Sequence, residues 1–553
     1  MDAALDAPGD VTRRRFWIGV GCATAAVAAF LLARLHAWPP HEDETLALII
    51  GSKPLGQMFH TVLHLRGGAP LHFLIVHVIS QISSSLTALR LISATFAVAS
   101  IPVIAFLLAR LSNRRTALVA TILVAASWVT LFHGIYGRMY SLFLFLSALS
   151  FVALLRAIER RRPIDWVLWA LVIYLTLAAH QYGAFVLATQ IVYTVVLARR
   201  RGFSARPALI ATAIVVVCAV PMWRSNLVLA GRADVGIAGN GTWLGGPVPF
   251  FEYLRRVLGD FVAGWTGLFV VTVAAASLGL LVLIRNRRST ALLVGLAFGV
   301  PAAGLILTSV GSSASAPETR HLIFLLPFFA LLVATGLLRV ARLARGYWPV
   351  AIAGSLAVLV AAEVVWGWQA TPALYAGEPA KRKAAREAAQ QWLASTSRPN
   401  DVLFGYEPVY LGALGGRMTN VIVPRADPTL ALKTLLAAPK PLGRGVWILD
   451  ASDGEQILNH WTKRYEIEDR SPGPAFETRV FGPFLVVRTY DPTLTPEMFL
   501  SDTLEVQRTG ESLQVESSGL NYQTARVALA HLEAIGSKPD PLAPSHAAGT
   551  RVR

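Results

Sequence analysis

The sequence predicts an α-helical protein that crosses a membrane many times, with about 11 transmembrane helices, followed by a C-terminal α/β domain. Of its 553 residues, 54% are hydrophobic and 15% are charged, whereas a soluble globular chain carries about 25% charged residues. The mean hydropathy is +0.53. Apolar stretches recur from Phe16 to Trp368, and many have the roughly 20 residues that a helix needs to cross a bilayer.

The first apolar stretch is too long for the core of a signal peptide, and no small-residue cleavage site follows it, so we expect a retained helix. The predicted spans are 16–36, 90–109, 116–133, 139–156, 165–180, 182–198, 207–223, 263–284, 290–310, 321–340 and 347–368. A twelfth stretch, 70–84, is shorter, contains His72 and His77, and ends in a polar run. Its status decides on which side of the membrane the C-terminus lies.

The basic residues indicate which side each loop occupies, because cytoplasmic loops are enriched in Lys and Arg. Short basic runs occur near residues 13–15, 110–115, 156–162, 199–206, 285–288 and 339–345. All of them fall on one side only if 70–84 does not cross. We therefore predict a juxtamembrane or re-entrant helix there, a cytoplasmic segment 1–15, a transmembrane domain 16–368, and an extracytoplasmic chain after Trp368, in the cytoplasmic (inner) membrane.

The net charge of +17 does not indicate a nucleic-acid partner, because the basic residues lie in short runs between apolar segments instead of on one surface. Cys22 and Cys218 both lie in apolar segments, so no disulfide framework is predicted. The partner that these patterns imply is the lipid bilayer itself.

The chain after Trp368 changes in character. Residues 369–530 are expected to form an extracytoplasmic α/β domain, with an amphipathic helix from Lys381 to Ala394. Short buried strands are predicted at 401–404, 445–450 and 484–489. The final segment, 531–553, is rich in Pro, Ser, Ala and Gly, and we expect it to be disordered.

An acidic cluster, His41-Glu42-Asp43-Glu44, follows the first span directly. Charges at the end of a spanning helix are expected to face water, a cavity or a polar ligand. A carboxylate in a partly dry site can act as a general base, which makes Asp43 and Glu44 candidate catalytic residues in an outer loop, 37–89. An equally weighted interpretation is a pair of solvated charges that cap a helix beginning near Thr45.

The same outer loop contains His60, His64 and Arg66. The two histidines are spaced i, i+4, so on a helix they can bind a metal together. The sequence places no third ligand beside them, and an interfacial position explains them equally well. A divalent metal therefore stays open, and no cofactor is predicted with certainty.

Further polar residues lie at the outer ends of predicted spans. Arg138 departs from the one-sided distribution of basic residues; it either reaches the membrane interface or binds an anionic headgroup. His180 and Tyr182 lie in the turn between the fifth and sixth spans, and Arg320 and His321 open the tenth. Two arginines and two histidines at one membrane face suit a phosphate-linked lipid, although each alone is compatible with interfacial anchoring.

The order of these features resembles the family-39-type glycosyltransferases of the GT-C fold, which include protein mannosyltransferases and the lipid A aminoarabinose transferase. The passages that carry the resemblance are Asp43-Glu44, Gly68-Ala69-Pro70-Leu71-His72-Phe73, Ala88-Leu89-Arg90-Leu91-Ile92-Ser93-Ala94, Arg138-Met139-Tyr140, His180-Gln181-Tyr182-Gly183 and Arg320-His321-Leu322 with Leu326-Pro327. Together they cover roughly residues 15–345.

The resemblance implies a GT-C-like membrane domain and an inverting transfer of a sugar from a polyprenyl-phosphate donor at the outer leaflet. Asp43 would then be the general base, with Glu44 supporting it. Arg138 and Arg320 would stabilise the phosphate leaving group. The residues expected near the sugar or phosphate are His180, Tyr182 and His321, and those expected in acceptor or loop contacts are His60, His64, Arg66 and His72.

The sequence also departs from the pattern that it resembles. Many relatives have His-Pro-Pro-Leu where this chain has Gly68-Ala69-Pro70-Leu71, and no carboxylate accompanies Arg138. A second acidic contributor, and any metal that it would hold, therefore stays open.

The sequence thus predicts a glycosyltransferase whose acceptor is a lipid, a glycan or a protein. One alternative is a transporter or flippase of polyprenyl-linked glycans, but such proteins tend to show inverted repeats and ionisable residues at mid-membrane. The other is a non-catalytic envelope assembly protein, which would lose no activity when Asp43 is changed.

Overall fold

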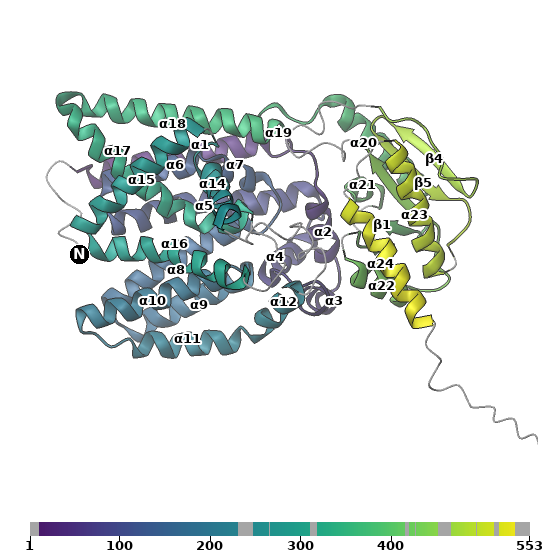
Figure 1. Cartoon of the computed structure of the whole chain (residues 1–553), viewed down its shortest axis with the longest axis horizontal. Helices are drawn as coiled ribbons and strands as arrows, with labels where there is room; N and C mark the ends of the chain where they lie inside the picture. The colour runs from purple at the N-terminus through teal and green to yellow at the C-terminus, as the bar shows by residue number, and fades with distance from the viewer. Residues whose placement is uncertain are drawn as a thin grey trace, which may run out of the picture. The chain divides into compact units, whose positions relative to one another are not determined.

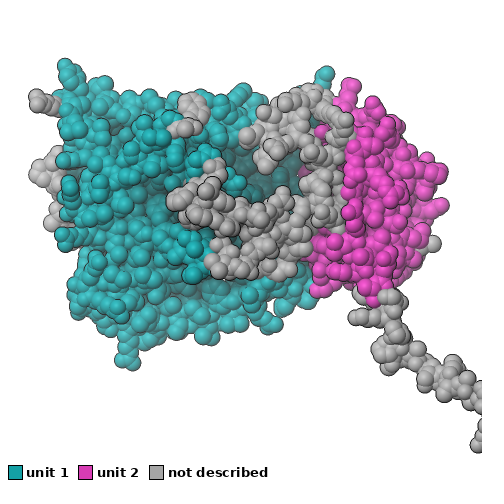
Figure 2. All heavy atoms as spheres, in the orientation of Figure 1, with its two compact units in different colours: residues 1–383, 414–418, 457–461 teal, residues 384–413, 419–456, 462–553 magenta. Residues whose placement is uncertain are grey.

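The computed structural model describes residues 10–230, 247–264, 266–309, 318–414, 420–425, 427–451, 466–493, 495–513 and 519–536. Figure 1 shows the arrangement of helices and strands along the chain. The chain forms two compact units, coloured separately in Figure 2. The first contains the described residues up to Lys383, and the second contains most of those from Ala384 onward.

The first unit is helical. Its N-terminal half contains α1 (Arg13–Arg34), α2 (Glu42–Gly51), α3 (Leu55–His60), η2 (Thr61–Arg66), α4 (Pro70–Ser80), α5 (Leu86–Leu111), α6 (Arg114–Ala126), α7 (Trp128–Ile135), α8 (Tyr140–Arg160), α9 (Pro163–Ala179) and α10 (Gly183–Arg201). Its C-terminal half contains α11 (Arg206–Cys218), α12 (Val220–Ala230), α14 (Pro247–Phe261), α15 (Thr266–Asn286), α16 (Arg288–Ser309), η3 (Thr319–Leu325), α17 (Leu326–Ala341), η4 (Arg342–Tyr347), α18 (Trp348–Ala370) and α19 (Pro372–Ala376).

Each predicted span coincides largely with a helix or a pair of consecutive helices. Among the described residues, 7 helices are long and apolar enough to cross a membrane, or up to 9 if the bent pairs α6–α7 and α11–α12 each form one span. The helix α9 is one of the shorter apolar helices. A helical protein with several apolar spans is therefore confirmed, whereas the number 11 stays a prediction. The short α4 occupies most of 70–84, and its re-entrant or juxtamembrane position also stays a prediction.

The degree of burial separates central helices from peripheral ones. The η3–α17 segment is 83% buried inside the protein, whereas α1 and α18 are only 22% and 17% buried. The exposed side chains of α1 and α18 are largely apolar, as expected for helices that face lipid. Close packing depends on glycine between α15 and α17: a Cβ on Gly279 or Gly336 would overlap the backbone of the other helix.

The second unit contains a five-stranded mixed sheet in the order β2-β1-β3-β5-β4. Its strands are β1 (Val402–Phe404), β2 (Val421–Val423), β3 (Gly445–Asp450), β4 (Phe476–Phe481) and β5 (Phe484–Thr489), and its helices are α20 (Ala380–Thr396), α21 (Val409–Leu414), α22 (Pro428–Ala437), α23 (Pro496–Ser512) and α24 (Gly519–Gly536). The strands β1, β2 and β3 are parallel, and β5 pairs with β3 and β4 in antiparallel fashion. The predicted α/β character of this region is confirmed.

The three strands predicted from sequence and the helix α20 are all present. The central strands β3 and β5 are buried throughout, which explains why continuous apolar runs identified them. The prediction missed β2, which has 3 residues, and β4, an edge strand that carries Glu477 and Arg479. The helix α24 continues to Gly536, into the segment expected to be disordered; residues 537–553 lie outside the described part of the chain.

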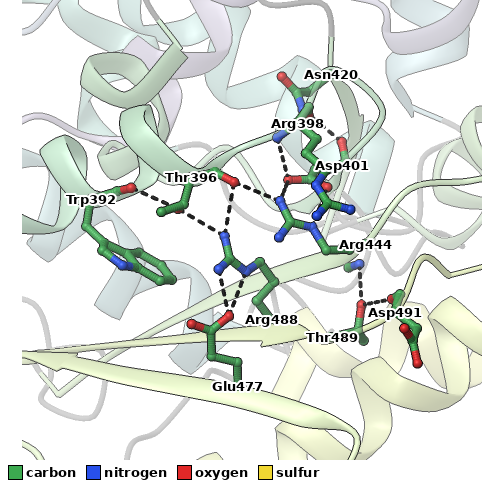
Figure 3. Close-up of polar contacts among 11 residues, drawn as sticks. Trp392, Thr396, Arg398, Asp401, Asn420, Arg444, Glu477, Arg488, Thr489 and Asp491 are labelled. Carbon is green, nitrogen blue, oxygen red and sulfur yellow. Dashed lines mark hydrogen bonds and ion pairs between the residues drawn. The ribbon is translucent and has the colours of Figure 1, made fainter.

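Buried arginines connect α20 to this sheet, as Figure 3 shows. The guanidinium of Arg444 donates to both carboxylate oxygens of Asp401, at 3.0 and 2.7 Å. Arg488 pairs with Glu477 and lies 4.6 Å from the centre of the Trp392 ring. Because both arginines also donate to the backbone carbonyl of Thr396, the C-terminal end of α20 is held against the sheet.

Candidate functional site

The acidic cluster opens helix α2 instead of preceding it. The helix begins at Glu42, with His41 as its N-cap. The Nδ1 atom of His41 accepts the Asp43 N–H at 3.1 Å, and the Glu44 carboxylate accepts the His41 N–H at 3.1 Å. This reciprocal arrangement is a capping box. Asp43 therefore lies in the first helical turn with its side chain free of a capping role.

Glu44 is engaged in a buried ion pair. Arg90 donates from Nε and Nη2 to its two carboxylate oxygens at 2.8 and 2.7 Å, and the Gly137 N–H donates to Oε1 at 2.8 Å. The side chain of Glu44 is 0% exposed, whereas that of Asp43 is 32% exposed. Glu44 thus ties α2 to α5 and to the turn before α8, and Asp43 is the carboxylate with an open side.

The remaining donors of Arg90 go to backbone carbonyls. Its Nη1 donates to Leu35 and Trp38 at 3.0 and 2.7 Å, and its Nη2 donates to Pro39 at 3.1 Å. One buried side chain therefore shapes the whole connection between α1 and α2, which delivers Asp43 to the site.

Asp43 faces the turn between α7 and α8. The Tyr136 hydroxyl donates to Asp43 Oδ2 at 2.7 Å, and Arg138 Nε lies 3.8 Å from the same oxygen. Arg138 Nη1 also donates to the Asp43 backbone carbonyl at 3.3 Å. Tyr136 was not predicted as a site residue. Its position two residues before Arg138 is the only signal for it in the sequence.

The charges around Asp43 keep it ionised. Burial by itself raises the pKa of this carboxyl, because it disfavours the charged form. The positive charges of Arg138 and Arg320, together with the Tyr136 hydrogen bond, outweigh burial and hold the pKa of Asp43 well below its usual range. Asp43 is therefore a carboxylate at neutral pH.

Arg138 and Arg320 each retain an unused buried donor. The Nε atoms of both are buried and have no hydrogen-bond partner among the described residues. Arg320 donates from Nη2 to Glu318 at 2.9 Å, and its guanidinium lies 5.5 Å from the centre of the Tyr140 ring. Because a buried unpaired donor is unfavourable, the two guanidinium groups are suited to an anionic ligand with several acceptor oxygens.

Aromatic and imidazole rings form the adjoining wall of the site. His321 lies 5.7 Å from Tyr140, 5.4 Å from His180 and 5.7 Å from Tyr182, measured between ring centres. Tyr140 in turn stacks on Tyr136 at 6.4 Å. The structure therefore places the predicted residues His180, Tyr182 and His321 side by side. Tyr140 connects these rings to Tyr136, the residue that donates a hydrogen bond to Asp43. Tyr140 was quoted in a motif but not predicted as a site residue.

His72 borders the same region. It is 2% exposed, and its Nε2 atom has no hydrogen-bond partner among the residues that the structure describes. Burial and the nearby charge of Arg138 lower the pKa of His72 to about 3, so the imidazole is neutral. A neutral imidazole can donate to or accept from an uncharged hydroxyl group.

His60 and His64 lie apart from these contacts. Both are exposed, on α3 and η2, and their rings stack at 5.2 Å. Arg66 ends the same π-helical turn. Within the described ranges, no group of three or more His, Cys, Asp or Glu side chains is arranged to hold a metal ion. Both oxygens of Glu44 already accept hydrogen bonds from Arg90.

Part of the chain resembles a known protein family in sequence. Residues 67–224 match the sequence model of the family described as dolichyl-phosphate-mannose-protein mannosyltransferase. No curated protein matches the chain.

Solved structures of other membrane proteins share the fold. The chain is similar to ArnT from Cupriavidus metallidurans bound to undecaprenyl phosphate, with 14% identity, a TM-score of 0.54, and 86% of this chain and 98% of that chain covered. It is also similar to the oligosaccharyltransferase AglB from Archaeoglobus fulgidus, in complex with an inhibitory peptide and a dolichol-phosphate, with 12% identity, a TM-score of 0.51, and 96% and 87% covered. The resemblance drawn from the sequence is thereby confirmed: the chain has the GT-C fold, and its residues 67–224 carry the sequence pattern of the protein mannosyltransferase family.

Proposed function

We propose that this protein is a glycosyltransferase that moves a sugar from a polyprenyl-phosphate donor to an acceptor at the outer face of the membrane. The acceptor hydroxyl oxygen attacks the anomeric carbon, and the bond from that carbon to the phosphate oxygen breaks. The polyprenyl phosphate leaves with the electron pair, and Asp43 takes the hydroxyl proton. The acceptor belongs to one of three classes: a lipid, a glycan or a protein.

The observation that carries this proposal is the pair of guanidinium groups beside an ionised Asp43. Charge builds on the phosphate oxygens as the sugar leaves, and fixed cations in a partly dry site stabilise it. Arg138 and Arg320 each have a buried Nε without a partner among the described residues. The similar structures support a lipid-phosphate ligand, since one contains undecaprenyl phosphate and the other a dolichol-phosphate.

The low pKa of Asp43 makes it a weak base in the free protein. A donor phosphate that binds Arg138 and Arg320 brings negative charge next to Asp43, and a like charge raises the pKa of a carboxyl. Donor binding therefore strengthens the base at the moment when the acceptor must be deprotonated. Glu44 supports Asp43 by holding the α2 helix in place.

The rings of His180, Tyr182 and His321 suit the sugar portion of the donor, because a ring face packs against an apolar sugar face and the polar atoms bind hydroxyls. We assign His72 to the same region, and His60, His64 and Arg66 to acceptor or loop contacts. We also propose that residues 16–368 form the transferase domain, that residues 369–530 lie outside the cytoplasm, and that the N-terminus is cytoplasmic.

The decisive experiment compares Asp43→Asn with Glu42→Gln in a purified transfer assay. Both changes remove one carboxylate from the same helical turn. We expect Asp43→Asn to reduce turnover by at least about 10²-fold, the lower range for general-base catalysis, and Glu42→Gln to leave it near wild type. Near-normal turnover of Asp43→Asn would refute the role of Asp43.

A further inference from the structure

A helix break leads into the arginine-containing turn. Ser127 adopts an extended conformation between α6 and α7, and the two helices are bent by 51° relative to each other. The first N–H groups of α7 therefore have no acceptor in the preceding turn. At membrane depth such a group must be satisfied by another part of the protein.

Glu363 supplies that acceptor from α18. Its Oε2 accepts the backbone N–H of Trp128, the first residue of α7, at 3.0 Å. Glu363 is 7% exposed and borders an apolar cavity lined by residues that include Phe261, Leu326 and Leu359. A carboxyl group inside a predicted span is unfavourable unless it has a defined role. Here one of its oxygens lies at the N-terminal end of α7, where the first N–H groups of the helix need an acceptor.

Hydrogen bonds also connect Trp128 to the segment that carries Arg320. The indole N–H of Trp128 donates to the Asp260 backbone carbonyl at 2.9 Å. The Asp260 carboxylate accepts a hydrogen bond from the Thr319 hydroxyl, and Thr319 is directly followed by Arg320. In the other direction, α7 ends at Ile135 and leads through Tyr136 to Arg138.

We infer that Glu363 is a positioning residue for the two-arginine anion site. By capping α7 it sets the direction of the helix that leads into the turn with Arg138. Through Trp128, Asp260 and Thr319 it holds the start of η3, which carries Arg320. The inference rests on the proposed function, because it takes the ligand of the two arginines to be a polyprenyl phosphate.

The test measures binding of undecaprenyl phosphate to the purified full-length protein. Glu363→Met removes the acceptor oxygen and replaces the side chain with an apolar one of similar length. Glu363→Gln keeps an oxygen that can accept the Trp128 N–H. Since small displacements of positioned groups lose up to about 10²-fold, we expect Glu363→Met to weaken the affinity by about tenfold. Glu363→Gln should restore it to within about twofold of wild type.

A matched control separates the hydrogen bond from general packing. Leu359 lines the same cavity on the same helix, so Leu359→Ala perturbs packing there without removing an acceptor. We expect its affinity to equal that of wild type. In turnover assays, Glu363→Met should raise KM for the donor and leave KM for the acceptor unchanged. Wild-type affinity in Glu363→Met, or an equal loss in Leu359→Ala, overturns the inference.

Trp128→Phe provides a second variant in case Glu363→Met does not fold. It keeps the backbone N–H that Glu363 accepts and removes only the indole donor to Asp260. We expect Trp128→Phe to bind undecaprenyl phosphate more weakly than wild type, as Glu363→Met does. An unchanged affinity would overturn the inference. If the wild-type protein itself does not bind undecaprenyl phosphate, the proposed donor class fails as well. If wild type and all variants bind equally, only the role of Glu363 fails.

Discussion

Arg90 and Glu44 form a bidentate ion pair in which both side chains are almost completely buried, at 1% and 0% exposure. The pair joins α5 to the first turn of α2, which also carries Asp43. Its geometry satisfies the condition under which a buried pair is tolerated, because the remaining guanidinium donors bind backbone carbonyls.

The first prediction concerns this pair. Glu44→Gln leaves a buried guanidinium without its counter-charge, which costs about 3–5 kcal/mol of stability. We expect a large drop in the thermal unfolding midpoint in detergent, and Glu44→Gln/Arg90→Lys should not recover it because Lys lacks the planar fork. Glu505→Gln, which breaks the exposed Arg508–Glu505 pair, is the control and should change stability by about 0–1 kcal/mol. Equal midpoints for Glu44→Gln and Glu505→Gln would contradict the prediction.

The second prediction concerns pH. Burial raises the pKa of Asp43. Among the groups that lower this pKa, the positive charge of Arg138 has the largest effect. Arg138→Gln should therefore raise that pKa, so the carboxyl needs a higher pH to stay ionised. In a plot of kcat/KM against pH, which reports the free enzyme, the acid limb should move to higher pH.

Arg320→Gln serves as a comparison, because the charge of Arg320 contributes less to Asp43 than that of Arg138. Its acid limb should move in the same direction by a smaller amount. Overlapping acid limbs for wild type and Arg138→Gln would show that Asp43 does not control the acid side of the profile.

The third prediction concerns the donor phosphate. Arg138→Ala and Arg320→Ala should each weaken binding of a polyprenyl-phosphate donor by about 1.5–3 kcal/mol, the range for hydrogen bonds to charged groups. Arg→Lys at either position should rescue only partly, since a point charge replaces a planar donor pair. The measurement is donor affinity by titration. If both Ala variants bind donor as tightly as wild type, the two arginines are interfacial anchors.

Much of the fold was predictable because the relevant signals are local. The apolar runs of the spans, and the continuous apolar strands β3 and β5, are visible within a window of a few residues. The strand β4 was missed because Glu477 and Arg479 interrupt its apolar pattern at an edge of the sheet. One of the two interpretations of the acidic cluster placed the start of a helix near Thr45, whereas the His41–Glu44 capping box starts α2 at Glu42.

The candidate site was predictable only in part, because its contacts join distant parts of the chain. The charge cluster identified Asp43, but nothing local distinguishes it from Glu44; the difference comes from Arg90, which is 46 positions further along. Tyr136 gains its role only when α2 packs against the turn before α8. Glu363 was overlooked although the sequence contains a signal for it, since a carboxylate inside a predicted span is rare.

The last prediction concerns the C-terminal unit. Its buried pairs, Arg444–Asp401 and Arg488–Glu477, hold its own helix and sheet together, which indicates a structural role for these charges. The groups that we assign to the reaction all belong to the first unit. We therefore expect a protein truncated after Ala376, where α19 ends, to retain turnover with the donor and a simple acceptor. Its acceptor choice or its stability should change.

The full-length protein is the control in the same assay, and donor affinity is measured for both proteins. Unchanged donor affinity with residual transfer supports a division of labour, in which the membrane domain carries the reaction and the C-terminal unit tunes the acceptor or the stability. If the truncated protein folds and binds donor normally but transfers sugar to no acceptor, the C-terminal unit supplies a group that the reaction needs. In that case the membrane domain does not carry the complete reaction. The C-terminal unit would then be needed to bring an acceptor hydroxyl to Asp43.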